Sequence, residues 1–173
     1  MKRLSTGMLV AFAIATVAGA CLHFVYTLLP NVIAALFSPV NESIWEHMKI
    51  IYWPLLVAML VLTRKGEKGD KGPWALAILI SSLGMLAIGY VYHIIMGGDS
   101  LVVDIIIYVV MMALAFVLAT GALDRPAIRG KSDLLVLLVI ALGCVMVLFT
   151  FLPPDMALFA DFSGANTWAR IPC

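Results

Sequence analysis

Charged residues are scarce in this sequence: only 12% of its 173 residues are Asp, Glu, Lys or Arg, whereas 64% are hydrophobic. A soluble domain of this size usually carries about 25% charged residues. The eleven basic and ten acidic side chains nearly cancel, so the net charge of +1 gives no indication of a nucleic-acid partner. The composition therefore predicts a chain that folds within a lipid bilayer.

Cysteine is rare as well. The three cysteines, Cys21, Cys144 and Cys173, lack the spacing of a disulfide framework or of a cysteine-rich metal site. No internal repeat, low-complexity segment or second domain is recognisable in the sequence. Residues 1–173 are therefore expected to form a single membrane domain.

Long apolar runs dominate what remains. Runs of about 18 or more apolar residues are typical of membrane-spanning helices, and four such runs are present. A fifth apolar run, Ile50 to Thr63, would cover only about 21 Å of a hydrocarbon core roughly 30 Å thick, so this span must include the polar residues before it. We predict an all-α bundle with spans at about 7–29, 44–63, 74–96, 101–123 and 134–152, an interfacial segment at 31–43 and a tail at 153–173.

The basic residues predict how this bundle is oriented, because Lys and Arg collect on the cytoplasmic side of a membrane. With five spans and the N-terminus inside, only Lys49 and Arg170 lie outside. The other nine are cytoplasmic: Lys2, Arg3, Arg64, Lys65, Lys68, Lys71, Arg125, Arg129 and Lys131. We therefore predict that the N-terminus is inside and the C-terminus outside.

The stretch SPVNESIWEHMK, residues 38–49, gathers most of the polar side chains near the second span. Ser38 followed by Pro39 is a typical helix start, with Ser as the N-cap, so this helix is expected to begin near Pro39. In such a helix Glu46 and His47 can both face the bundle while Trp45 turns outward to the membrane interface.

The predicted topology places further ionisable residues at the same depth as this stretch. His23, His93 and Asp104 all lie near the outer ends of their spans. An ionisable group inside a span costs on the order of 2.5 to 3.5 kcal/mol, and such groups usually face one another or a wet cavity. The sequence therefore predicts an outward-open polar pocket. The expected metal ligands are His23, His47, His93 and Glu46. The expected catalytic acids, bases or proton carriers are Glu46, Glu42 and Asp104. The expected pocket residues are Asn41, Ser43, Lys49 and Tyr90.

Three histidines with nearby carboxylates suit a divalent metal, and zinc is the first choice. A metal-bound water would be a nucleophile at neutral pH, and a membrane-borne ester or amide is the natural substrate at this depth. No spaced metal-binding pair such as HExxH stands on one helix, so hydrogen-bonded packing histidines are an alternative. Proton- or metal-ion-coupled transport and a structural assembly subunit also remain open, as does a homo-oligomer.

The pattern Asn41-Glu42-Ser43-x-Trp45-Glu46-His47-x-Lys49 resembles the signature of an uncharacterised family of small bacterial multispan membrane proteins. The resemblance implies a location in the bacterial inner membrane and brings no known activity. The tail carries a second, looser similarity in ALFADFSG, residues 157–164. This tail could lie over the pocket mouth and bring Asp155 or Asp161 to it, or it could be an ordinary exposed tail.

Overall fold

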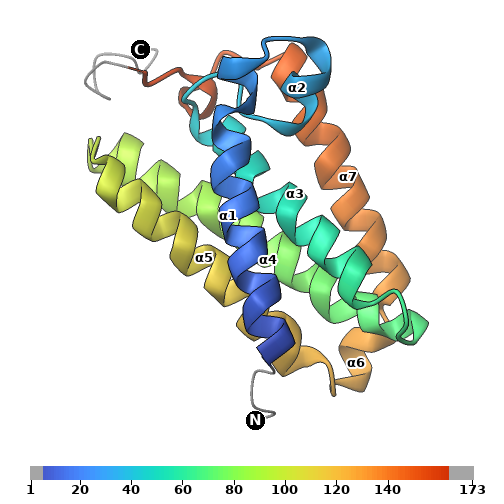
Figure 1. Ribbon diagram of the computed structural model, residues 1–173. Helices are drawn as coiled ribbons and strands as arrows, with labels where there is room; N and C mark the ends of the chain where they lie inside the picture. Colours follow the sequence, from blue (N-terminus) through green and yellow to red (C-terminus); the bar gives the residue numbers. More distant parts are fainter. Residues whose placement is uncertain (1–5, 164–173) are drawn as a thin grey trace.

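The computed structural model of the protein describes residues 6–163 and is helical throughout (Figure 1). Lys2, Arg3, Arg170 and Cys173 lie outside the described residues. Five helical segments are long and apolar enough to cross a membrane: α1 Thr6–Leu28, α3 Ile44–Leu62, α4 Lys71–Tyr90 with its π-helical continuation η2 Val91–Ile95, α5 Leu101–Ala122 and α7 Ser132–Phe151. Shorter elements connect them: α2 Val32–Phe37, η1 Lys68–Asp70, α6 Pro126–Arg129 and η3 Ala157–Phe159. The predicted five-helix membrane bundle is confirmed.

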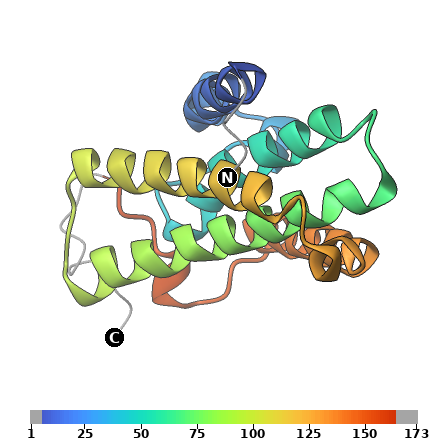
Figure 2. The same cartoon turned by 90° about the horizontal axis from the view of Figure 1, so that it is seen from below.

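Helix α3 lies at the centre of the bundle and is the most buried of the five. It packs between α1 and α4, and α4 in turn contacts α5 and α7 (Figures 1 and 2). The peripheral helices expose large aliphatic side chains such as Ile14, Ile106 and Leu137. In water such a surface would aggregate, whereas in a bilayer it contacts lipid tails.

The described basic residues of the connections gather at one end of the bundle, which we call the basic end (residues 64–71 and 125–131). Here Arg129 pairs with both Glu67 and Asp70, and Lys68 pairs with Asp133 at 2.7 Å. These contacts join the α3–α4 connection to the α5–α7 connection. Helix α1 begins at the same end. Which side of the membrane this end faces stays a prediction.

The opposite end, called the site end, is formed by residues 29–43, 96–100 and 153–163 (Figure 1). Helices α1 and α3 approach each other closely at Gly19. Pro54 lies inside α3 and cannot donate a hydrogen bond to the carbonyl of Ile50. That carbonyl lies against Gly19 of α1, where an added Cβ would stand 2.2 Å from its oxygen. Only glycine allows this approach.

Candidate metal centre

The segment before α3 is a loop and not a helix. Helix α3 begins at Ile44, and Ser43 is its N-cap, with a side-chain oxygen that accepts the N–H of Glu46 at 3.3 Å. The prediction that the helix begins near Pro39 with Ser38 as N-cap is therefore wrong. Ser43 and Glu46 have the S-x-x-E spacing of a capping box, a helix-start signal that competes with Ser38-Pro39 in the sequence.

Ser38 instead ties the loop to α1. Its fully buried hydroxyl donates to the carbonyl of Leu22 at 2.5 Å and accepts the N–H of Tyr26 at 3.0 Å. These are two backbone groups that an uninterrupted helix would pair with each other. The Ser38 hydroxyl thus joins the loop to the turn of α1 between Leu22 and Tyr26, which includes His23.

Lys49 binds the loop before α3 from the interior of the bundle. It is fully buried, and its Nζ donates to Glu46 Oε2 at 2.5 Å, to the Ala35 carbonyl at 2.7 Å and to the Ser38 carbonyl at 3.2 Å. Three donors therefore meet three acceptors. Lys49 neutralises a buried carboxylate and also satisfies carbonyls at the end of α2, which have no partner within that helix.

Glu46 has both carboxylate oxygens engaged. Oε2 accepts the N–H of Val40 at 3.0 Å in addition to the ammonium of Lys49, and Oε1 accepts the hydroxyl of Thr150 at 2.8 Å. Its side chain is 3% exposed. Glu46 therefore joins the loop, α3 and α7, and the structure does not place it with the histidines predicted to share a metal.

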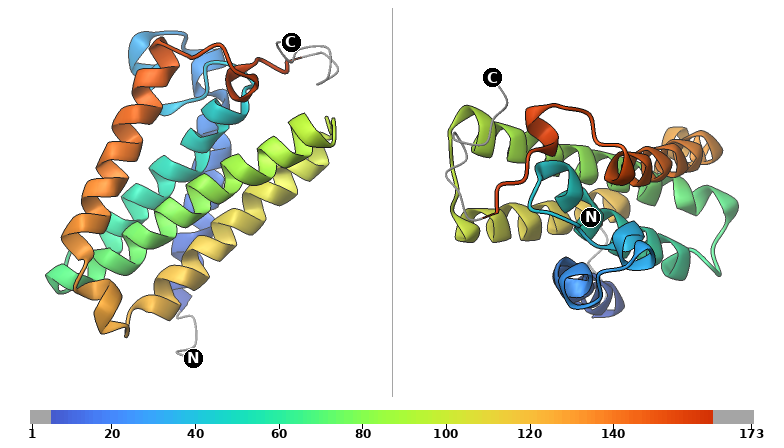
Figure 3. Two further views of the ribbon diagram at one scale, coloured as in Figure 1. Left: turned by 180° about the vertical axis from the view of Figure 1, so that it is seen from behind. Right: turned by 90° about the horizontal axis from the view of Figure 1, so that it is seen from above.

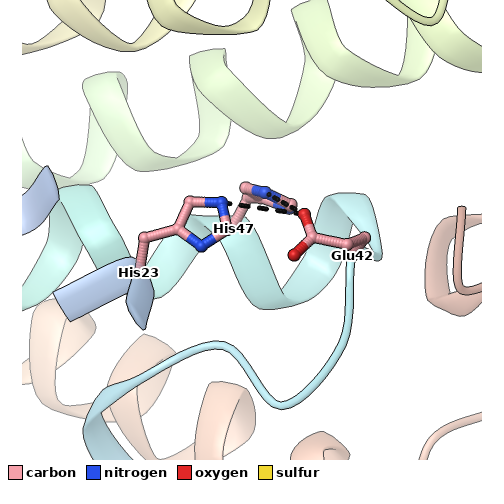
Figure 4. Close-up of side chains that lie close together, drawn as sticks. All are labelled: His23, Glu42 and His47. Carbon is pink, nitrogen blue, oxygen red and sulfur yellow. Dashed lines mark ion pairs between the residues drawn. The ribbon is translucent and has the colours of Figure 1, made fainter. Parts of the chain in front are cut away.

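The structure brings together His23 from α1, Glu42 from the loop and His47 from the first turn of α3 (Figure 4). Glu42 Oε2 lies 3.2 Å from His47 Nε2 and 3.7 Å from His23 Nε2. One potential ligand atom from each residue lies within 4.8 Å of the others. We call these three residues the triad. They form a group that could hold a metal ion.

Backbone contacts orient two members of the triad. His47 Nδ1 lies 2.8 Å from the carbonyl of Ser43, which can only accept, so Nδ1 carries the hydrogen. The backbone N–H of Glu42 donates to Asp161 Oδ1 at 3.2 Å. The Glu42 carboxylate lies outside the spans, and its hydrogen bond with His47, helped by the positive field of both histidines, lowers its pKa despite partial burial.

A second histidine–carboxylate pair lies nearby, between the ends of α4 and α5. His93 Nε2 lies 3.0 Å from Asp104 Oδ1, and His93 Nδ1 lies 2.8 Å from the carbonyl of Gly98. His93 belongs to the π-helical turn η2, a type of irregularity that is frequent at functional sites. His93 is not part of the triad.

Residues 153–163 reach over this end of the bundle. Phe159 packs against Trp45 with ring centroids 5.0 Å apart, and Phe162 stacks on His93 at 5.8 Å. Trp45 is 7% exposed, so the prediction that it turns outward to the interface is wrong. The adjacent residues Asp161 and Phe162 thus contact the triad and the second pair, whereas Asp155 is exposed.

The remaining predicted pocket residues divide into two groups. Asn41 Oδ1 accepts the N–H of Ser43 at 3.1 Å and shapes the loop that carries Glu42. Tyr90 is 40% exposed on α4 and is not a member of the triad. Sequence reasoning gave Ser38 a different role, as a helix N-cap, and overlooked Thr150; both hydroxyls contact segments that are distant in the sequence.

The fold and the triad together define a multispan membrane protein with a two-histidine, one-carboxylate group suited to a metal ion. The chain belongs to a family of unknown function, DUF6512, whose model matches residues 1–166. Comparison with curated proteins found no match, and comparison with solved structures found none. The resemblance to an uncharacterised family is confirmed to this extent, while the proposed signature and the bacterial origin stay predictions.

Proposed function

We propose that the protein is a metal-dependent membrane hydrolase that holds one divalent ion, zinc in the first instance, with His23, Glu42 and His47. The observation that carries this proposal is the convergence of three ligand atoms from three separate segments, α1, the loop and α3. Each segment has its own anchor, so the group does not arise from one helix face. The loop and α1 are joined by Ser38, and the loop and α3 by Glu46 and Lys49.

The spacing of the triad suits a tetrahedral ion. Ligands at about 2.0 to 2.2 Å from a zinc ion lie roughly 3.4 Å from one another in tetrahedral geometry. The Glu42–His47 and Glu42–His23 separations of 3.2 and 3.7 Å bracket this value. His47 donates its Nδ1–H to a backbone carbonyl, which is the usual arrangement of a metal-ligating histidine and leaves its Nε2 for the metal.

Two histidines and one carboxylate are a ligand set found in catalytic zinc sites. A zinc ion held there would leave its fourth position for a water molecule and would lower the pKa of that water. The adjacent His93–Asp104 pair would act as the proton carrier, because both groups can exchange a proton at 3.0 Å. The triad lies at the end of the bundle, where lipid carbonyls and headgroups are expected. A membrane-borne ester or amide is therefore the proposed substrate class.

Metal content of tag-free protein purified in detergent tests the proposal. Wild-type protein loaded with Zn²⁺ and desalted should retain about one ion per chain, and His47→Ala, His23→Ala and Glu42→Gln should each lose it. His93→Ala is the matched control, because it removes a histidine at the same end of the bundle from outside the triad. Wild type that retains no zinc, or equal loss in His93→Ala, would overturn the assignment. Metal-dependent cleavage of lipid esters or amides is then screened on the loaded protein.

A further inference from the structure

A groove follows one face of α7 from the basic end toward the site end. Its larger part has a volume of about 640 Å³ and lies between α3 and α7. Its smaller part, about 290 Å³, lies between the start of α4 and the start of α7. Ile140 lines both parts, so they adjoin and form one track.

The walls of the larger part are apolar. On α7 the lining residues Ile140, Cys144, Val147 and Phe151 recur every three or four positions and form one helical stripe. The opposite wall comes from Tyr52, Trp53 and Leu56 of α3. The hydroxyl of Tyr52 donates to the carbonyl of Val139 at 2.9 Å, so the ring alone faces the groove. Helix α7 packs mainly against α4 and makes fewer contacts with α3 (Figure 3).

The part of the groove at the basic end carries lysine side chains. It is lined by Lys68, Lys71, Ser132 and Asp133. Lys68 is paired with Asp133, and the Ser132 hydroxyl donates to the Lys68 carbonyl at 3.1 Å. Lys71 is half-buried and makes no ion pair with any residue between 6 and 163. Among residues 6–163, the Lys71 ammonium at the mouth of the groove therefore has no counterion.

We propose that this groove binds one anionic phospholipid from the leaflet at the basic end. The headgroup phosphate would lie at Lys71, and one acyl chain would follow the α7 stripe past Ile140. Charge complementarity selects this occupant, because basic pockets between membrane helices attract anionic headgroups. A helix from a second copy would place apolar residues against Lys71, and free phosphate would leave the apolar track unfilled. This site is independent of the triad.

Native mass spectrometry tests the proposal on the full-length protein, released from detergent after equilibration with equal amounts of phosphatidylglycerol and phosphatidylcholine of identical chains. Wild type should retain one phosphatidylglycerol at least fivefold more often than one phosphatidylcholine. Lys71→Ala should abolish this preference. Lys65→Ala is the matched control, since Lys65 is exposed at the same end and does not line the groove.

A second pair of variants tests the apolar track. Cys144→Phe fills the groove and should reduce retention of both lipids, whereas Cys21→Phe, which places the same ring on the exposed face of α1, should not. Equal retention of the two lipids by wild type, equal effects of Lys71→Ala and Lys65→Ala, or unchanged retention in Cys144→Phe would overturn the proposal. A dimer that Cys144→Phe dissociates would overturn it too, by assigning the groove to a second copy.

Discussion

At the scale of single residues, the polar stretch 38–49 separates into side chains that build the loop and side chains that face the triad. Lys49 and Glu46 are nearly without solvent contact and meet at 2.5 Å. Removing one partner of a buried pair leaves an uncompensated charge, which costs about 3 to 5 kcal/mol, whereas replacing both by apolar or neutral groups costs less. The pair is therefore expected to act as one unit in stability and to hold the loop that carries Glu42.

We predict that Lys49→Met destabilises the protein strongly and that Lys49→Met combined with Glu46→Gln recovers much of the loss. The double variant removes both charges, so no buried carboxylate remains unpaired. Thermal unfolding in detergent, followed by intrinsic fluorescence, measures both effects. Lys65→Met serves as the control for the loss of an exposed lysine. Additive destabilisation in the double variant would show that the two side chains stabilise the loop independently.

The Glu42–His47 contact predicts a pH dependence of the metal-free protein. Because the folded-state pKa of Glu42 is lowered, its contact adds stability at pH values above its ordinary pKa of 4.5, and this stability is lost as the pH falls through the folded-state value. Wild type should therefore have a higher Tm than Glu42→Gln at pH 6, and the difference should shrink below about pH 4. A constant Tm difference from pH 6 to pH 3.5 would contradict the ionic contact.

Part of this site could be predicted from the residues alone. The depth of His23 and His47 in their spans placed them together, and the structure pairs both with a carboxylate. The sequence could not tell which carboxylate, because the choice between Glu42 and Glu46 depends on where α3 begins. Once Ser43 caps the helix, Glu46 turns toward Lys49 and Thr150, and Glu42 is left in the loop beside the histidines.

At the scale of helices, the contact between α1 and α3 determines whether His23 reaches the triad. A Cβ at Gly19 would stand 2.2 Å from both the Ile50 carbonyl oxygen and the Tyr108 hydroxyl oxygen. The Tyr108 hydroxyl also donates to the Thr16 carbonyl at 2.7 Å, so α1, α3 and α5 meet here. A bulkier residue would push α1 outward and move His23 away from Glu42.

Gly19→Ala should therefore destabilise the protein by about 1 to 3 kcal/mol, the usual cost of overpacking, and should weaken zinc retention. Gly121→Ala is the matched control, because a Cβ at that helical glycine meets nothing within 4 Å. That change should be neutral or slightly stabilising through helix propensity. Thermal unfolding and zinc content measure the two effects. Equal Tm values for the two variants would contradict the close approach of α1 to α3.

Hydrophobic runs predicted the five spans because a membrane-spanning helix needs consecutive apolar residues, and such a run can be recognised from neighbouring residues alone. The start of α3 was not predicted correctly because the sequence contains two capping signals, Ser38 and Ser43, five residues apart. Tertiary contacts determine which of the two caps the helix. Ser38 is held by α1 and the Ser38 carbonyl by Lys49, which keeps residues 38–43 out of a helix. The π-helical turn at His93 leaves no comparable signal in the sequence.

At the scale of the whole molecule, the basic residues of the connections lie at the end of the bundle opposite the triad. The connections at the basic end hold Arg64, Lys65, Lys68, Arg125, Arg129 and Lys131, and the triad lies at the other end. Because positively charged loops stay in the cytoplasm, the triad is expected to face the outside. A metal ion would then reach the triad from the outer side of the membrane.

Cysteine labelling in intact cells tests this orientation. In a variant with the natural cysteines replaced by alanine, Met156→Cys should react with a membrane-impermeant maleimide, because Met156 is 58% exposed at the site end. Lys65→Cys should react only after the membrane is permeabilised, because Lys65 is exposed at the basic end. The reverse pattern would place the triad on the cytoplasmic side. The metal would then come from the cytoplasm and the proposed substrate from the inner leaflet, while the geometry of the triad would be unaffected.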